Sequence, residues 1–287
     1  MKNKLIIIPN NIDNINKLKN VGITAFLFPV EKYSIGYNTF SIDEINSLKC
    51  NKYLLINRIL NTKEIDDLIK DINLYTDIKG IFFDNIGICY AFNSLNIEKI
   101  YYSMHSLTNY HSIDYLLSQG ITSAVVSNDI TLNEIKYISD NINDKLVYFL
   151  YGKSPIMYSR RNLVSNFNKH YNCSVTNPTI IEKVSKKEFK LVDNNYGTIA
   201  YDNNYYNGLS LMNTIDISKI KYYLVSLIDV NDDDVIKLIE SIIENDNQKL
   251  LSLYINTNIG FLNTETIYRV KGTDRNDWIN GTSRWFK

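Results

Sequence analysis

The chain has 287 residues, of which 45% are hydrophobic and 22% are charged. This composition is that of a globular protein and excludes long disordered stretches. Lys and Arg together number 31, as do Asp and Glu, so no net charge draws the chain toward nucleic acid or an anionic membrane. Any contact with RNA must therefore come from a local patch. The length suits one large barrel domain or two ordinary domains.

The three cysteines, Cys50, Cys89 and Cys173, are far apart and form no Cys-x-x-Cys pair. This usage fits a reducing compartment, and we expect these residues to serve packing. The apolar run at residues 5–8 ends at Pro9 and is too short for a signal peptide or a membrane span. We therefore expect a cytoplasmic protein that does not bind membranes.

Short apolar runs, rich in β-branched and aromatic residues, alternate along the chain with stretches of helical periodicity. This alternation predicts parallel strands joined by crossover helices. The predicted strands are residues 5–8, 24–28, 53–56, 80–83, 99–102, 123–126, 146–150 and 222–226. The predicted helices are residues 12–20, 42–49, 63–74, 112–119, 132–141 and 232–244.

Residues at the helix ends support these assignments. Ser41 stands three residues before Glu44, which predicts a capping box, and Thr62 is expected to cap the helix that follows it. Gly22 and Gly120 follow apolar helical stretches, where a left-handed residue is expected before the next strand.

Eight strand-like runs, seven of them evenly spaced through residue 150, predict an α/β protein with a closed (β/α)8 TIM-like barrel. An open nucleotide-binding sheet is disfavoured, because Pro9-Asn10-Asn11 stands where a Gly-x-Gly-x-x-Gly turn would follow the first strand. Short runs at 179–184, 188–192 and 198–201, with a turn at 193–197, predict a β-rich insertion between strands seven and eight. We assign residues 1–167 and 217–254 to the barrel, 168–216 to the insertion and 255–287 to a C-terminal extension.

Reactive groups of such a barrel lie at the carboxyl ends of its strands. The polar residues just past the apolar runs are Asn57, Arg58, Asp84, Asn85, His105, Asn128, Asp129, the Tyr151-Gly152-Lys153 segment and Asp229. For any one of them, a structural role as a turn or cap residue is more common than catalysis, and Asp129 resembles a helix-start residue. His105 is the better catalytic candidate because of its near-neutral pKa. His111 and His170 have no matching partners, so we propose no metal triad.

The segment from Tyr151 to Phe167 carries the densest set of polar groups. Gly152 lets the backbone approach a ligand closely, and the pair Arg160-Arg161 beside Ser159 suits a carboxylate or a phosphate. An Arg pair is more often a solvated face than an anion site, but the position at the barrel mouth makes the two interpretations about equal here. No Gly-x-Ser-x-Gly elbow and no His-Glu-x-x-His motif supports ordinary proteolysis.

This segment resembles the signature of the U32 peptidase family. Further resemblances, in the order of the family, are Lys32-Tyr33-Ser34-Ile35, Met104-His105-Ser106-Leu107-Thr108-Asn109, Tyr115-Leu116-Leu117-Ser118-Gln119-Gly120, Val126-Ser127-Asn128-Asp129, Tyr196-Gly197-Thr198, and Gly260-Phe261-Leu262 with the run at 266–270. The resemblance covers most of the chain and implies a TIM-like barrel. With the positions at the barrel mouth, it predicts His105, Asp84 and Asp129 as catalytic, and as substrate-binding Asn57, Asn109, Asn128, Gly152, Lys153, Ser159, Arg160 and Arg161.

The chain departs from the family in residues that bear on its cofactor. Pro155 and Asn162 stand where many relatives have cysteines of an iron–sulfur cluster, and of the later pair only Cys173 could correspond. One thiolate cannot hold a four-iron cluster, so we predict no cluster and no metal. Gly36 stands where the family usually has an arginine, and Asp129 is a shortened form of its acidic residue.

The resemblance implies a role in tRNA modification, namely the prephenate-dependent 5-hydroxylation of a wobble uridine. It also implies tRNA as a partner and pairing with a longer U32 paralogue, with prephenate as a co-substrate. Two alternatives stay open: a noncatalytic partner that stabilises an active paralogue, and a peptidase as the family label says. Arg160, Arg161, Lys153 and Arg58 are the local candidates for an RNA contact.

Overall fold

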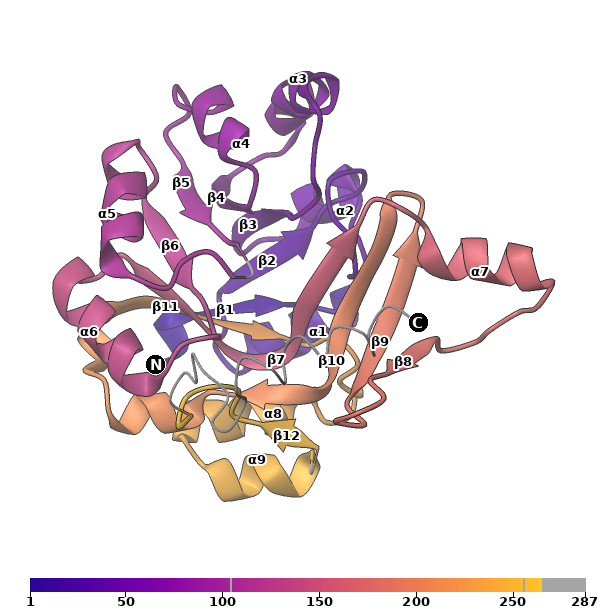
Figure 1. Cartoon of the computed structure of the whole chain (residues 1–287). Coiled ribbons are helices and arrows are strands. Elements are labelled where there is room, and N and C mark those ends of the chain that lie inside the picture. The colour runs from indigo at the N-terminus through magenta and orange to yellow at the C-terminus, as the bar shows by residue number, and fades with distance from the viewer. Residues whose placement is uncertain (104, 255, 265–287) are drawn as a thin grey trace, which may run out of the picture.

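Eight parallel strands close into a ring in the computed structural model, which describes residues 1–103, 105–254 and 256–264 (Figure 1). The last barrel strand pairs in parallel with both the first and the seventh, which closes the sheet. The predicted (β/α)8 barrel is thereby confirmed. Its strands are β1 (Leu5–Ile8), β2 (Ala25–Pro29), β3 (Asn51–Ile56), β4 (Ile78–Phe83), β5 (Glu98–Tyr101), β6 (Ser123–Val126), β7 (Leu146–Ser159) and β11 (Ile220–Ser226).

Helices surround the ring (Figure 1). They are α1 (Ile12–Asn20), α2 (Ile42–Ser47), α3 (Thr62–Asp71), α4 (Ile86–Ala91), α5 (Tyr110–Ser118), α6 (Leu132–Ile142), α8 (Val235–Glu244) and α9 (Asn247–Leu253). The sequence pattern did not predict α4 or α9.

The ends of these helices confirm two of the predicted signals and correct a third. The capping box of Ser41 and Glu44 is present, and Gly22 and Gly120 both adopt positive φ. The expected cap at Thr62 is wrong, because the Asn61 side chain accepts from the Glu64 amide and Thr62 is the first helical residue. An Asn side chain reaches the third amide as well as a Thr side chain does.

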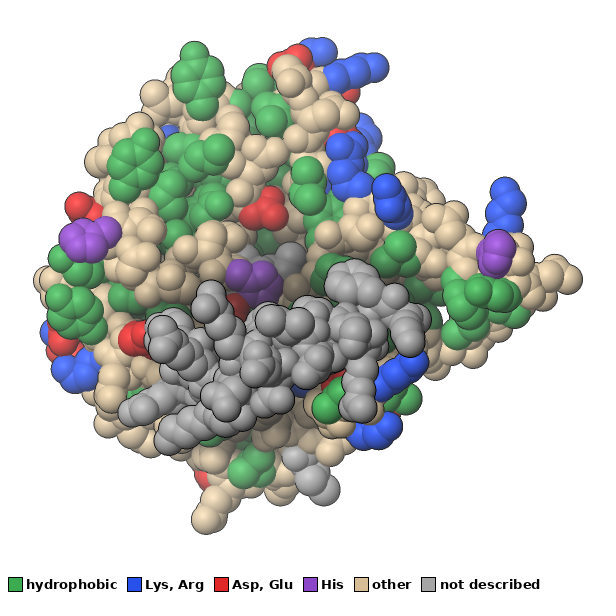
Figure 2. Space-filling model, in the orientation of Figure 1, with side chains coloured by type: hydrophobic (Ala, Val, Ile, Leu, Met, Phe, Trp, Pro, Cys, Tyr) green, Lys and Arg blue, Asp and Glu red, His purple; other side chains and the backbone are tan. Residues whose placement is uncertain are grey.

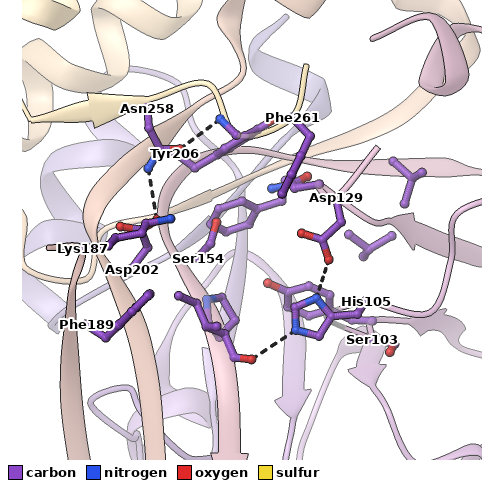
Figure 3. Close-up of a pocket in the computed structure, with 18 residues that line it drawn as sticks. Ser103, His105, Asp129, Ser154, Lys187, Phe189, Asp202, Tyr206, Asn258 and Phe261 are labelled. Atoms are coloured by element: carbon purple, nitrogen blue, oxygen red, sulfur yellow. Dashed lines mark hydrogen bonds and ion pairs between the residues drawn. The ribbon is translucent and has the colours of Figure 1, made fainter. Parts of the chain in front are cut away.

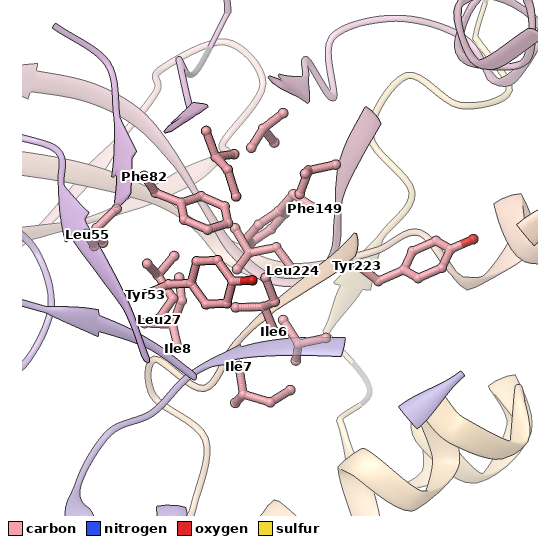
Figure 4. Packing of buried hydrophobic residues seen from close by; sticks show 14 of the residues in the cluster. Ile6, Ile7, Ile8, Leu27, Tyr53, Leu55, Phe82, Phe149, Tyr223 and Leu224 are labelled. Atoms are coloured by element: carbon pink, nitrogen blue, oxygen red, sulfur yellow. The ribbon is translucent and has the colours of Figure 1, made fainter. Parts of the chain in front are cut away.

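The barrel interior is filled by side chains that alternate along each strand (Figure 4). Ile6, Tyr53, Phe82 and Leu224 are buried inside the ring, whereas Ile7 points away from it (Figure 4). Alternation follows from the two-residue repeat of a strand, and both faces are apolar because helices cover the outside. Each such side chain stabilises the fold by roughly 1.5–3 kcal/mol, so the ring is a rigid base for the loops at its mouth.

β7 is much longer than predicted and leaves the barrel. Its first half pairs in parallel with β6 and β11, and its second half pairs antiparallel with β10 (Gly197–Asn207). The prediction ended this strand at residue 150, with the end of the apolar run. Pro155 is tolerated since it lies at an irregularity in the pairing with β10, where a missing N–H costs little.

The insertion forms what we call the arm, residues 152–207. It contains the second half of β7, α7 (Leu163–Tyr171), β8 (Thr179–Ile181), β9 (Glu188–Asn194) and β10. β8, β9 and β10 form an antiparallel sheet that continues from β7, as the predicted β-rich insertion requires. α7 was not predicted, and it projects from the far end of this sheet (Figure 1).

The described part of the C-terminal region returns to the barrel mouth. β12 (Thr257–Asn258) pairs with β10, and the Leu262 carbonyl accepts from the Leu132 amide at the start of α6. Most of the predicted C-terminal extension, with the alternating run at 266–271, Trp278 and Trp285, lies outside the described residues. No helix within the described ranges is both long and apolar enough to cross a lipid bilayer.

Gly152 is the residue on which the departure of β7 from the barrel depends. Its φ is +133°, and a Cβ built there would lie 2.7 Å from the Ser226 Cβ and 2.8 Å from the Ser226 carbonyl oxygen. Any side chain would therefore push β7 off β11. We expect Gly152→Ala to lower the free energy of unfolding by about 3 kcal/mol or more, measured by urea denaturation.

The matched control is Gly22→Ala, because Gly22 also has a positive φ, of +90°, but its Cβ would come no closer than 3.6 Å to the Lys2 side chain. It should lose only the backbone preference, about 1–2 kcal/mol. Equal losses in the two variants would show that the close approach to Ser226 does not matter.

Candidate functional site

A cavity of about 270 Å³ opens at the barrel mouth between β5, β6, β7 and the arm (Figure 3). Its walls are mostly apolar, and polar side chains stand at its rim and floor. The lining residues are Tyr102, Ser103, His105, Val125, Val126, Asn128, Asp129, Phe149, Ser154, Pro155, Ile156, Lys187, Phe189, Asp202, Tyr206, Asn258, Gly260 and Phe261. A concave apolar space with a few convergent polar groups is the usual form of a small-molecule site.

His105 and Asp129 form a hydrogen-bonded pair on one side of this cavity (Figure 3). His105 Nδ1 lies 2.5 Å from Asp129 Oδ2, and His105 Nε2 lies 3.2 Å from the Ile156 carbonyl oxygen. Asp129 was interpreted as a helix-start residue, and that interpretation is wrong: Thr131 caps α6, so the Asp129 carboxylate is free to bind the imidazole.

The partners of His105 set its charge. Both partners are acceptors, so both ring nitrogens must donate, and only the imidazolium form satisfies both bonds. Partial burial lowers the pKa of His105, but the hydrogen bond to Asp129, the Ile156 carbonyl and the Asp129 charge outweigh it and raise that pKa above 6.5. A ligand that displaces the Ile156 carbonyl would meet an N–H donor, so His105 can give a proton and, once neutral, take one back.

A second charged pair faces the cavity from the arm (Figure 3). Lys187 Nζ lies 2.8 Å from Asp202 Oδ2, and Asn258 Nδ2 donates to the same carboxylate oxygen at 3.3 Å. Lys187 and Asp202 lie across the cavity from His105 in Figure 3. The apolar cavity thus has one cation on each side, each with an acidic partner.

Two further residues that line the cavity each have a buried polar atom without a partner among the described residues. The Asn128 Oδ1 and the Ser154 Oγ are both buried, and neither makes a hydrogen bond within that part of the chain. Burying an unsatisfied polar atom costs roughly 1–3 kcal/mol. A rotation of these side chains would let a ligand in the cavity satisfy both atoms.

Asp84 follows β4 at the same end of the barrel but does not line this cavity. Burial raises the pKa of its carboxyl to about 6, against a hydrogen bond from its own backbone amide that lowers it. No salt bridge to Asp84 is present among the described residues. A desolvated carboxyl with a pKa near 6 suits proton transfer, and its catalytic role stays a prediction.

Four of the predicted substrate-binding residues make contacts within the fold itself. Asn57 bonds both the amide and the carbonyl of Ile35, and Asn109 caps α5 by accepting from the Ser112 amide. Gly152 allows the close approach to Ser226, and Ser159 Oγ accepts from the Arg161 amide. Their contact with a substrate stays a prediction.

The predicted RNA-contact candidates divide into buried and exposed ones. Arg58 is buried, contacts Glu64 Oε1 at 2.6 Å and stacks on Tyr196 with its guanidinium carbon 3.6 Å from the ring centroid. Lys153 is buried and pairs with Asp229 at 2.8 Å. These two cations attach the arm to the barrel.

The other two candidates face solvent. Arg160 lies 3.8 Å from Glu64 Oε2 and is half exposed, and Arg161 is exposed. The two arginines follow the end of β7 at Ser159, so they lie beyond the cavity rather than in it. Their substrate-binding role stays a prediction.

The cysteines do not fit the iron–sulfur cluster of many relatives. Cys50 precedes β3 at the amino end of the barrel, Cys89 is buried in α4, and Cys173 follows α7 on the arm. No group of three His, Cys, Asp or Glu residues within the described ranges is placed to hold a metal ion. The expected absence of a cluster stays a prediction.

Sequence reasoning missed the arm and tail residues of the cavity, Lys187, Asp202, Asn258 and Phe261. They lie in the insertion and in the C-terminal region, where the evenly spaced strand pattern does not extend. Phe261 was noted only as part of the Gly260-Phe261-Leu262 resemblance. Nothing in the local sequence marks Lys187, Asp202 or Asn258, because their approach to His105 depends on where β7 carries the arm.

Comparison with known proteins identifies the family of this chain. The sequence model of peptidase family U32 matches residues 38–230, and the chain belongs to that family. The chain is also similar to the tRNA hydroxylation protein P2 of Bacillus subtilis, with 23% identity over 178 residues, and to the tRNA hydroxylation protein P of Haemophilus influenzae, with 24% identity over 131 residues.

These matches are partial. The first spans 58% of this chain and 58% of the Bacillus subtilis protein, and the second spans 44% of this chain and 28% of the Haemophilus influenzae protein.

The crystal structure of the Bacillus cereus spore cortex-lytic enzyme SleL aligns with a TM-score of 0.41 and 12% identity, over 84% of this chain and 74% of that one. A TM-score this low supports no argument about function.

The raised pKa of His105 has a measurable consequence. The folded protein binds its proton more tightly than the unfolded chain, so this pair stabilises the fold below about pH 6.5 and the contribution is lost as pH rises through the folded-state pKa. We expect NMR titration to show a His105 pKa above 6.5, and Asp129→Asn to lower it. His111 and His170 serve as internal controls, whose signals should not respond to Asp129→Asn. An unchanged His105 titration in that variant would contradict the pairing.

The effect of Asp84 on the pH dependence of stability should be opposite in sign to that of an ordinary paired carboxylate. Because burial raises its folded-state pKa to about 6, stability falls as pH rises from about 4 through 6. We expect Asp84→Asn to increase the free energy of unfolding at pH 8, by at most about 3 kcal/mol, and to leave it nearly unchanged at pH 4. Urea denaturation at the two pH values measures this, and a loss of stability at pH 8 would show that the carboxylate has a stabilising partner.

Proposed function

We propose that this chain acts in tRNA modification, in the prephenate-dependent 5-hydroxylation of a wobble uridine, as the enzyme or as a subunit of it. The single observation that supports an enzymatic role is the His105–Asp129 pair at the wall of an apolar cavity. The names of the two bacterial relatives support the substrate class. Membership of the family and this site agree with a barrel enzyme that acts at its strand ends.

In this proposal the cavity binds the small co-substrate and His105 moves a proton. Prephenate is a cyclic dicarboxylate, and the cavity offers an apolar interior with a cation on either side, His105 and Lys187. The Lys187 ammonium has three N–H donors and uses one on Asp202, so it can donate to a ligand carboxylate as well. The unpartnered Asn128 and Ser154 oxygens fix the orientation of the bound molecule.

Proteolysis is not supported by the same geometry. A hydrolytic nucleophile needs a Ser or Cys hydrogen-bonded to a base. Both ring nitrogens of His105 are occupied by Asp129 and the Ile156 carbonyl, and Ser154 makes no hydrogen bond to it among the described residues. Cys50, Cys89 and Cys173 do not line the cavity.

A second candidate is a noncatalytic partner of an active paralogue, and one observation favours it. Gly36 stands where the family usually has an arginine, and the Tyr201 hydroxyl fills the space of any side chain there, 2.2 Å from a built Cβ. The arm therefore occupies part of the mouth that an arginine would reach. A chain in this role would stabilise its paralogue and perform no chemistry of its own.

Nucleoside mass spectrometry of tRNA from a deletion strain tests the proposal. We expect 5-hydroxyuridine derivatives to be lost in the deletion strain and restored by the wild-type gene. They should also be lost when cells cannot make prephenate and return when it is supplied. Unchanged levels in the deletion strain would rule out a role in this modification.

Point variants in the same strain separate the enzyme from the noncatalytic partner. His105→Gln and Asp129→Asn should lower the modification rate by roughly 10²–10⁴-fold if His105 transfers a proton, while protein levels stay normal. His111→Gln is the matched control and should restore the modification fully. Full restoration by His105→Gln would favour the noncatalytic role.

A further inference from the structure

α7 is fixed at its start but leaves its side chains in solvent. The Leu163 amide donates to Thr198 Oγ1 at 2.7 Å, and the Ser165 amide and hydroxyl both donate to Asp193 Oδ2, at 2.9 and 3.0 Å. No residue of the helix is buried. Most short helices gain their stability from an apolar face packed on the core. α7 instead is held through polar bonds to β9 and β10, so its exposed side chains are available to a partner.

Two aromatic rings dominate this exposed helix. Phe167 and Tyr171 lie one turn apart on the same side, with side chains 50% and 63% exposed and ring centroids 4.6 Å apart. His170 adds a third ring, 4.6 Å from Tyr171. Exposed aromatic rings grouped in this way are uncommon on a surface that binds nothing. The rings are not coplanar, because Phe167 is inclined by 47° and His170 by 89° to Tyr171. Each ring therefore offers a face of its own on which an unstacked base could lie.

The charged residues of the segment that contains these rings are all cationic, although Asp193 contacts Ser165 and Glu64 lies 3.8 Å from Arg160. Residues 152–181 contain Lys153, Arg160, Arg161 and Lys169 and no Asp or Glu, although the whole chain is neutral. Three of the four, Arg160, Arg161 and Lys169, are exposed. Figure 2 shows hydrophobic, cationic and His side chains together on the projecting part of the arm. This is the local basic patch that a neutral RNA-binding protein needs.

We propose that α7 and the preceding Arg160-Arg161 pair form an RNA-docking face that holds unpaired nucleotides of the substrate tRNA. The inference rests on the proposed function and names the surface that binds its substrate. Phe167 and Tyr171 stack on bases, and the three exposed cations contact phosphates. Duplex RNA would bind less well, because its bases remain stacked on one another and cannot reach the rings.

The position of this face relative to the cavity agrees with that role. The Ile156 carbonyl holds His105, and Arg160 follows four residues later, roughly 13 Å along an extended strand. In this proposal RNA held on α7, which projects from the arm (Figure 1), reaches the cavity past Arg160. A protein partner would instead use the edge of β8 that no described strand pairs with, where Ile180 and Ile181 are exposed. Charge and aromatic rings together favour RNA for α7.

Binding measurements on the full-length protein test this face. The probes are unmodified tRNA transcribed in vitro, a short oligouridine single strand and an RNA duplex, measured by fluorescence anisotropy. We expect Phe167→Ala and Tyr171→Ala each to weaken single-strand and tRNA binding by about 5- to 150-fold. Arg160→Ala and Arg161→Ala should each lower the slope of log affinity against log salt by about 0.7.

Two substitutions elsewhere serve as matched controls. Tyr115→Ala removes a tyrosine of α5 that is 64% exposed, and Lys237→Ala removes an exposed cation of α8. Both should bind RNA like the wild type. Because the α7 rings are largely exposed, their alanine variants should keep the wild-type melting temperature, which separates lost contacts from unfolding.

The outcomes separate this inference from the proposed function. Wild-type affinity in the Phe167 and Tyr171 variants, in cells whose tRNA is still modified, would overturn the docking face and leave the function standing. Loss of a co-purifying protein with RNA affinity unchanged would also overturn it, since the face would then bind protein. Unchanged tRNA modification in the deletion strain, with RNA binding that still depends on α7, would defeat the proposed function alone.

Discussion

The structure depends on one strand that belongs to two sheets. β7 pairs with β6 and β11 inside the barrel and then, beyond Gly152, with β10 of the arm. Because the chain is continuous through this point, the direction of β7 as it leaves the barrel determines where the arm lies. The arm cannot move relative to the mouth without breaking the contact of Gly152 with Ser226, the Lys153–Asp229 ion pair and the stacking of Arg58 on Tyr196.

The arm limits where ligands can enter the mouth. Tyr201 of β10 is fully buried and occupies the space above Gly36. Lys153 pairs with Asp229, and Arg58 stacks on Tyr196, so the cations of this region attach the arm to the loops after β3 and β11. The described cavity next to His105 therefore lies on the other side of the mouth, above β5, β6 and β7.

The barrel could be predicted from the sequence because its signals are local. Each strand is a short apolar run followed by a helix, and the ends of helices carry their own cap residues, as Ser41 and Glu44 do. The path of β7 could not be predicted, since Gly152 and Pro155 resemble terminators until their neighbours Ser226 and Tyr201 are known. Long-range pairing decides such positions, and sequence pattern does not report it.

The residues of the candidate site also divide into those that the sequence indicated and those that depend on long-range pairing. His105 and Asn128 were recognisable because they follow strands of a barrel, and the structure brings both to one cavity with Asp129. Lys187, Asp202 and Asn258 were not recognisable, because the arm and the tail reach the mouth through long-range pairing with β7 and β10. Arg58 and Lys153 were candidates for a ligand contact by type and position, yet their burial against Tyr196 and Asp229 is a property of the folded arm.

The same strand also joins the two halves of the proposed function. Ile156, whose carbonyl accepts from His105, and Ser154, whose hydroxyl faces the cavity, lie on β7, and Arg160 follows its end. The residues that hold the imidazole and the residues that would hold RNA are therefore fixed to each other by one extended segment. A site built on a rigid element keeps its geometry better than one built on loops. The RNA-docking face on α7 and the proton-transfer site at His105 lie on different elements. In this proposal β7 holds the two sites in a fixed position relative to each other.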